Sequence, residues 1–403
     1  MKDCLNIVVT GDVDSGKSTL IGRALYDTGS LPIGKAMEIN GVCRELNREF
    51  EFAYLLDSLE EERRGQLTID TTQSFCRLKR GKGLNFIDVP GHRELLKNML
   101  SGSSYADVAV LVLDIRCPIE EQTKRHAFIL KFLGITHVIV AVNKMDSVGF
   151  KYEIFEKAKE SISGLFSEIS LSPEYFIPIF AKRGDNIARG SSNMPWYNGL
   201  PLIRLLSAYD KKGRGSSFRF SVQDIYNLNG KTKVALGEVM SGCVKRKEKI
   251  VVLPENKEYT IKTIRAFNKN KAMAKAPEGI GLILDEMRGI RRGQVICKAD
   301  LPEVKREIRA KILCVLPFRA AEKMRFVCAT QDISVSIKEV RGVWDIASLK
   351  EKSAKGPLHE FDLAEVVLAF GSPAVVERYT GSNSLGRFVL EGDTGIRAAG
   401  VIL

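Results

Sequence analysis

The chain has 403 residues, of which 44% are hydrophobic and 27% are charged, which is an ordinary balance for a globular protein. This length exceeds what one core usually holds, so we expect two or three domains. No stretch approaches the ~20 uncharged apolar residues of a membrane helix, so we expect no membrane partner. The N-terminal segment runs straight into a strand pattern, which predicts no cleaved signal. The eight cysteines are scattered without a CxxC pair and predict reduced thiols in the cytoplasm.

The net charge of +12 is concentrated in the middle of the chain. Residues 211–300 carry 20 lysines and arginines against 9 aspartates and glutamates, whereas residues 1–210 carry 26 against 27. This excess predicts a basic surface. Such a surface could bind an acidic partner or nucleic acid, or it could simply face water, and the sequence favours neither alternative.

Up to about residue 208, short apolar runs alternate with amphipathic patterns, which predicts an α/β domain with a doubly wound, mostly parallel sheet. The predicted strands are 5–10, 84–88, 108–114, 137–143 and 175–181. The predicted helices are 18–26, 95–100, 120–133 and 152–169. We expect residues 1–209 to form this domain.

The segment DKKGRGSS at 210–217 has the composition of a linker. After it, strand patterns recur with turns about every ten residues, which is typical of β-barrels. The clearest patterns are FRFSVQDIY, KVALGEVMSG and YTIKTIRAF, then EIRAKILCVL, DISVSIKEV and DLAEVVLAF. We expect one β-barrel domain over 215–300 and a second over 303–403.

The stretch GDVDSGKS fits the phosphate-loop pattern G-x-x-x-x-G-K-[ST] and lies between a strand pattern and a helix pattern. Gly11 and Gly16 let the backbone curl so that successive N–H groups point at phosphate oxygens. Lys17 is expected to reach the β- and γ-phosphates, and Ser18 to hold Mg²⁺. The expected nucleotide cradle comprises Gly11, Asp12, Val13, Asp14, Ser15, Gly16, Lys17, Ser18 and Thr19.

Two later motifs extend this site. Asp88 ends an apolar strand in DVPG, where its carboxylate is expected to bind Mg²⁺ through water and the Gly91 N–H to approach the γ-phosphate. Asn143, Lys144 and Asp146 form NKMD, whose carboxylate can accept two hydrogen bonds from guanine that adenine cannot offer. The sequence therefore predicts GTP and GDP as the bound nucleotides.

Two further residues are candidates for the chemical step. His92 directly follows the Pro-Gly turn and is expected to orient the attacking water, although a lone histidine is more often structural. Thr68 lies in a mixed-charge stretch that suits a mobile switch closing over Mg²⁺ and the γ-phosphate. The catalytic candidates are thus His92, Lys17 and Thr68, and the Mg²⁺ candidates are Ser18, Thr68 and Asp88.

These motifs resemble the elongation-factor branch of GTPases. VDSGKST, DVPGH and NKMD match its nucleotide motifs, and Asp14 is typical of that branch. FAK at 180–182 stands where the branch usually has Ser-Ala-x, and the resemblance implies that the Ala181 N–H reaches guanine O6, with Lys182 beside it. A GTP-binding domain followed by two barrels is also the domain order of the branch.

Within the branch, LIGRALYDTGSL, LLDSLEEE and NMPWYNG are similar to the GTPase subunit of heterodimeric ATP sulfurylase. In that family, a partner adenylyltransferase small subunit makes adenosine 5′-phosphosulfate from ATP and sulfate. NMPWYNG is also similar to archaeal elongation factor 1-alpha. Elongation factors carry a Gly-Tyr or His-rich loop in the third domain, which LPFRAAEKMRFVCAT lacks. The resemblance therefore implies GTP hydrolysis coupled to sulfate activation.

Two alternatives stay open. A translation factor that binds aminoacyl-tRNA or the ribosome is favoured by the basic middle domain, because such a surface binds phosphate backbones. A divergent GTPase that acts as a binding module is the third reading. The chain has one phosphate loop, built for guanine, so under the sulfurylase reading the adenylation belongs to the partner subunit.

Overall fold

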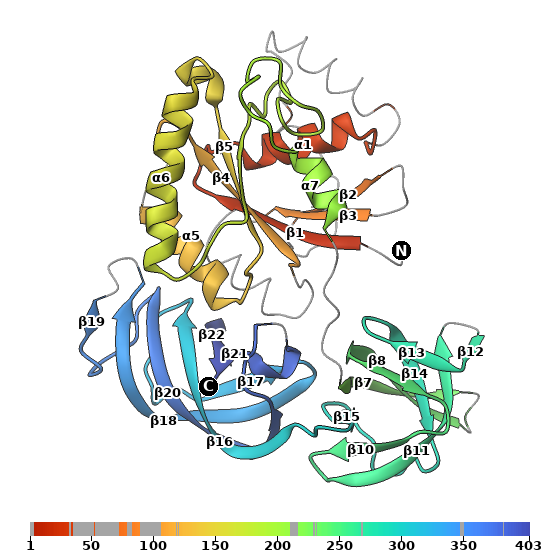
Figure 1. Ribbon diagram of the computed structural model, residues 1–403. Helices are drawn as coiled ribbons and strands as arrows, with labels where there is room; N and C mark the ends of the chain where they lie inside the picture. Colours follow the sequence, from red (N-terminus) through yellow and green to blue (C-terminus); the bar gives the residue numbers. More distant parts are fainter. Residues whose placement is uncertain are drawn as a thin grey trace. The chain divides into compact units, whose positions relative to one another are not determined.

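The computed structural model describes most of the chain, which falls into two compact units (Figure 1). The described residues are 4–31, 34, 52, 72–78, 83–88, 106–117, 119, 121–209, 217–228, 230, 232–266, 269–346, 350–381 and 383–403. The first unit contains those up to Tyr209, and the second those from Ser217 onward. The candidates Thr68, Gly91 and His92 lie outside the described residues, as do the predicted helix 95–100 and residues 210–216 of the linker.

The first unit is built on a sheet with the strand order β2-β3-β1-β4-β5-β6. The strands are β1 (Cys4–Gly11), β2 (Thr72–Arg77), β3 (Gly83–Asp88), β4 (Val108–Asp114), β5 (Val138–Asn143) and β6 (Tyr175–Pro178). All neighbours pair in parallel except β2, which is antiparallel to β3. The mostly parallel α/β sheet predicted from the sequence is confirmed.

Helices cover both faces of this sheet (Figure 1). They are α1 (Lys17–Asp27), α5 (Glu121–Phe132), α6 (Tyr152–Glu168) and α7 (Leu202–Ala208), and a 3-10 turn η1 (Met145–Val148) follows β5. The apolar residues of α1 and α7 share one core with β1, β3 and β4. Strands covered on both faces are apolar throughout, which explains why β4 and β5 were predicted accurately.

The polar ends of the parallel strands meet at one edge of the sheet. β1 ends in the phosphate loop, β3 in Asp88, β4 in Asp114 and β5 in Asn143. Ligand sites of open α/β sheets lie outside these carboxyl ends, so the architecture itself places a candidate site here. None of the helices among the described residues combines the length and apolar character needed to cross a bilayer.

The second unit contains two closed antiparallel sheets. In the first, the order β10-β15-β7-β8-β14-β11-β12 closes through pairing of β10 with β11, and β9 pairs with β13 alongside. Its strands are β7 (Phe218–Leu228), β8 (Thr232–Ser241), β9 (Cys243–Lys245), β10 (Lys249–Leu253), β11 (Lys257–Ala266), β12 (Lys269–Lys271), β13 (Met273–Lys275), β14 (Gly279–Leu284) and β15 (Val295–Lys298). Closure removes the exposed sheet edges that would otherwise invite pairing with other chains.

The second closed sheet has the order β17-β21-β22-β16-β20-β18-β19 and closes through β17 and β18. Its strands are β16 (Glu303–Cys314), β17 (Met324–Cys328), β18 (Gln331–Asp345), β19 (Glu351–Lys352), β20 (Asp362–Val376), β21 (Arg387–Gly392) and β22 (Gly395–Ile402), with a 3-10 turn η2 (Ser384–Gly386) before β21. The predicted fold class, an α/β domain followed by two β-barrels, is therefore confirmed.

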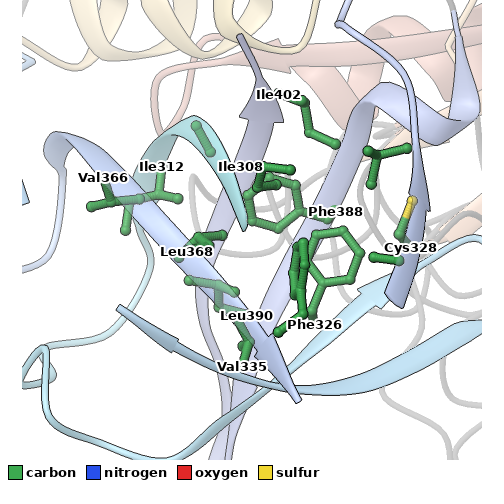
Figure 2. Packing of buried hydrophobic residues seen from close by; sticks show 14 of the residues in the cluster. Ile308, Ile312, Phe326, Cys328, Val335, Val366, Leu368, Phe388, Leu390 and Ile402 are labelled. Atoms are coloured by element: carbon green, nitrogen blue, oxygen red, sulfur yellow. The ribbon is translucent and has the colours of Figure 1, made fainter. Parts of the chain in front are cut away.

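The core of the second barrel contains packed phenylalanines, of which Figure 2 labels Phe326 and Phe388. The ring of Phe326 lies 4.7 Å from that of Phe370 and 4.8 Å from that of Phe388, measured between centroids. The two barrels also share contacts within this unit, because the buried guanidinium of Arg219 on β7 donates to Glu377 Oε1 at 2.8 Å.

Candidate nucleotide-binding site

The phosphate loop has a backbone that side chains would obstruct. Gly11 and Gly16 have φ values of 150° and 94°, in the region that favours glycine. A Cβ on Gly11 would lie 2.1 Å from the Val112 carbonyl oxygen, and a Cβ on Gly16 would lie 2.3 Å from Asn143 Nδ2. Both glycines are therefore required by the close approach of β4 and β5 to the loop.

The next two residues place a cation and a hydroxyl at the start of α1. Lys17 Nζ donates to the carbonyl oxygens of Gly11 at 2.9 Å and Asp12 at 2.8 Å. Burial lowers the pKa of Lys17, and the carboxylates of Asp88, Asp12 and Asp14 oppose this effect. The loop thus directs its lysine inward at a helix N-terminus, where N–H groups attract anions such as phosphate.

Ser18 and Asp88 were both predicted to bind Mg²⁺. The Ser18 hydroxyl donates to Asp88 Oδ2 at 3.1 Å. The end of β3 and the start of α1 therefore bring together two oxygen atoms that can act as metal ligands. Mg²⁺ is bound in nucleotide sites by one or two protein oxygens plus phosphates and waters, so this pair fits the ion. Among the residues that the structure describes, no cluster of three or more His, Cys, Asp or Glu side chains suits a metal.

Asn143 joins three loops of the site through one buried carboxamide. Its Nδ2 donates to the Ser15 carbonyl at 2.8 Å, and its Oδ1 accepts the Ala181 N–H at 3.0 Å. The Ala181 N–H thus bonds Asn143 in this structure, and its expected contact with guanine O6 stays a prediction. Lys182, the next residue after Ala181, is exposed. Strand β6 ends at Pro178, earlier than predicted, because Phe180 forms a β-bridge with Asp185.

A pocket lies between the phosphate loop and the ends of β4 and β5. Its lining residues are Asp12, Val13, Asp14, Ser15, Asp114, Arg116, Cys117 and Lys144. Lys144 Nζ contacts Asp114 Oδ2 at 2.9 Å, and Asp146 is exposed two residues further on. The structure therefore brings four of the predicted phosphate-loop residues, Asp12 to Ser15, and the lysine of NKMD around one cavity.

Sequence reasoning missed the residues that support the site. Thr123 Oγ1 on α5 donates to Asp12 Oδ2 at 2.8 Å, and the buried His126 and Thr10 share a hydrogen bond of 2.7 Å. Asp114 was also missed, although it ends an apolar run just as Asp88 does. That shared position at a strand end was the signal that could have revealed it.

Comparison with known proteins identifies the family. Residues 2–249 match the family of the elongation factor Tu GTP binding domain, and residues 307–403 match the GTP-eEF1A C-terminal domain-like family. The chain belongs to the elongation factor Tu and elongation factor 1-alpha family of GTPases. Membership confirms the predicted guanine nucleotides, GTP and GDP, and the GTPase class.

Relatives of this GTPase include elongation factor 1-alpha proteins and a sulfate adenylyltransferase subunit. It is 33% identical over 427 residues to elongation factor 1-alpha of Pyrobaculum arsenaticum, covering 100% of this chain and 95% of that protein. It is 33% identical over 424 residues to elongation factor 1-alpha of Archaeoglobus fulgidus, covering 100% and 98%. It is 32% identical over 405 residues to sulfate adenylyltransferase subunit 1 of Sulfurovum sp., covering 96% and 84%. Sequence identity alone therefore does not decide between an elongation factor and a sulfate adenylyltransferase subunit.

Proposed function

We propose that this GTPase is the large subunit of a sulfate adenylyltransferase. In this role it couples GTP hydrolysis to the formation of adenosine 5′-phosphosulfate from ATP and sulfate by a separate adenylyltransferase small subunit. The likeness to sulfate adenylyltransferase subunit 1 extends over 96% of the chain, both barrels included.

The observation that carries the proposal is the connection between β16 and β17. Phe318 in this connection is 4% exposed, and its backbone exchanges hydrogen bonds of 3.1 and 2.9 Å with Leu358. The connection is therefore folded against its own barrel. Elongation factors carry a Gly-Tyr or His-rich loop at this place, and a short turn anchored by the buried Phe318 supports a function other than holding aminoacyl-tRNA.

The residues of the nucleotide site have defined roles under this proposal. The phosphate loop and Lys17 hold the phosphates, Ser18 and Asp88 hold Mg²⁺ together with Thr68, and Asp146 selects guanine. Bound Mg²⁺ supplies neutralisation of phosphate charge. His92 orients water, so that catalysis consists mainly of positioning, as phosphoryl transfer requires.

The test is a coupled assay with the partner. The chain is co-expressed with an adenylyltransferase small subunit, and pyrophosphate release is measured with ATP and sulfate, with and without GTP. We expect GTP to stimulate release, and Lys17→Ala to abolish the stimulation while leaving GTP-independent release by the small subunit unchanged. Release that GTP does not change would contradict the proposal.

A second candidate is a translation-type factor. The full-length likeness to elongation factor 1-alpha and the excess of cations in residues 211–300 favour it. Filter binding of aminoacyl-tRNA with GTP separates the two, because non-specific phosphate contacts lose about 10³-fold or more in affinity between 50 and 200 mM salt. Nanomolar binding that persists at 200 mM salt would favour the translation factor.

A further inference from the structure

We propose that Asp114 and Arg116 are positioning residues that hold Lys144, the lysine of NKMD, in place for the guanine nucleotide. The inference rests on the guanine-binding part of the proposed function and is independent of the coupled process. It assigns a role to the end of β4, which none of the nucleotide motifs includes.

Sheet register brings the two strand ends together. Asp114 on β4 is the parallel partner of Asn143 on β5, and the Ile115 N–H donates to the Asn143 carbonyl at 3.0 Å. Lys144, the next residue, has φ 62° and ψ 36°, a left-handed conformation that is uncommon for a residue with a side chain. With its backbone in this conformation, Lys144 contacts Asp114 through Nζ and Oδ2 at 2.9 Å.

Arg116 holds the carboxylate of Asp114, which in turn contacts Lys144. Its backbone N–H and its Nε both donate to Asp114 Oδ1 at 3.0 Å, and its Nη2 donates to Oδ2 at 2.6 Å. Two parallel bonds from a guanidinium define the carboxylate plane, which a lysine alone would not do. Asp114 Oδ2 therefore points at Lys144 from a defined direction.

The local charges keep this arrangement ionised. Burial alone would raise the pKa of Asp114, but hydrogen bonds from Arg116 and then from Lys144 hold it well below its usual range. Asp114 chiefly, and Asp146 more weakly, raise the pKa of Arg116, so the guanidinium lies within electrostatic reach of both carboxylates. The carboxylate of Asp114 is thus an anion throughout the physiological pH range.

Holding Lys144 has two consequences for nucleotide binding. A lysine has a flexible four-carbon stem, and fixing it in advance removes an entropic cost from binding. A lysine released from Asp114 would also be drawn to Asp146, two residues away. That contact would compete with the two hydrogen bonds that the Asp146 carboxylate must accept from guanine. Both effects predict weaker binding of GDP when the Asp114 contact is lost.

The experiment is a double-mutant cycle read by the dissociation rate of a fluorescent N-methylanthraniloyl GDP from the full chain. We expect Asp114→Asn and Lys144→Ala each to raise the rate about 10-fold, or about 1.4 kcal/mol. The double variant should dissociate no faster than Lys144→Ala alone, because Asp114 acts through the lysine. Glu156→Gln is the matched control, since Glu156 forms an ion pair with Lys159 on α6.

Three outcomes distinguish the possibilities. Asp114→Asn with a wild-type dissociation rate, or fully additive effects in the double variant, would overturn the inference while leaving the guanine site intact. Wild-type protein that fails to bind the probe would overturn the guanine site itself. If Asp114→Asn does not fold, Arg116→Gln tests the same contact, with thermal unfolding of each variant as the check on folding.

Discussion

Asn143 illustrates how much of the nucleotide site depends on one buried side chain. Its carboxamide bonds the Ser15 carbonyl and the Ala181 N–H, which belong to loops far apart in the sequence. Removing it would leave both backbone groups without this partner, and an unsatisfied buried group costs about 1–3 kcal/mol. The residue therefore holds the phosphate loop to the base-recognition loops.

The contact between Gly16 and Asn143 gives a prediction at this scale. Gly16→Ala places a methyl group 2.3 Å from Asn143 Nδ2 and is expected to lower GDP affinity at least about 10-fold, measured by titration calorimetry. Gly149→Ala is the matched control, because Gly149 has φ 63° but a Cβ there meets no described atom within 4 Å. It should show only backbone strain of about 1–2 kcal/mol in unfolding and normal affinity. Equal GDP affinities for the two variants would contradict the steric explanation.

At the scale of elements, the sequence predicted strands best where both faces are covered. β4 and β5 are continuous apolar runs, and their bounds were predicted almost to the residue. β2 was missed because it is an edge strand of polar composition, in which Phe75 is 46% exposed. The short strands β9 and β13 were missed because three residues carry too little periodicity to distinguish a strand from a turn.

The site was predictable to the extent that its chemistry lies within contiguous motifs. The phosphate loop and NKMD were found because each has a fixed spacing. The Asp114 contact with Lys144 depends on which strand ends are neighbours and in which register, and the chain order does not reveal that. The hydrogen bond from the Ala181 N–H to Asn143 was not foreseen for the same reason, since the two residues lie 38 positions apart.

The phenylalanine core of the second barrel gives a prediction for an element. Phe326 on β17 is fully buried, and its ring contacts those of Phe370 and Phe388. Figure 2 shows Phe326 beside Phe388. Phe326→Ala should destabilise the barrel unit by about 3–5 kcal/mol in urea unfolding, since it removes a large apolar side chain and leaves a cavity. Tyr226→Ala, at an exposed position on β7, should change stability by less than about 0.5 kcal/mol. A loss below about 1 kcal/mol for Phe326→Ala would contradict this packing.

At the scale of the whole molecule, cysteine ionisation links stability to pH. None of the described cysteines forms a disulfide, and burial raises the pKa of Cys297 and of Cys328 to about 12. In the unfolded chain a thiol ionises near pH ~8.5, so the folded state binds more protons above that pH. The stabilisation is therefore fully present below pH ~8.5 and is lost as the pH rises toward the folded pKa.

The corresponding prediction concerns the slope of stability with pH. Between pH 9 and 11 the unfolding free energy of the barrel unit should fall by up to about 1.4 kcal/mol per pH unit for each such thiol. Cys328→Ala should reduce this slope by one such contribution, because it removes a buried thiol. Parallel pH profiles for wild type and Cys328→Ala would show that this thiol does not titrate as described.

At the scale of the whole molecule, the family relationship identifies the chain as a GTPase, and we expect it to be specific for guanine. We expect Asp146 to carry the base specificity, because its carboxylate can accept two hydrogen bonds that guanine donates. Asp146→Asn replaces one acceptor with a donor, which suits the carbonyl of xanthine and mispairs with guanine.

The most direct measurement compares GTP and XTP hydrolysis by wild type and Asp146→Asn, with kcat/KM determined for each pair. We expect the preference for GTP over XTP to fall by about 100-fold or more and XTP to become the better substrate of the variant. A variant that still prefers GTP to the same degree as wild type would contradict the assignment of guanine recognition to this site.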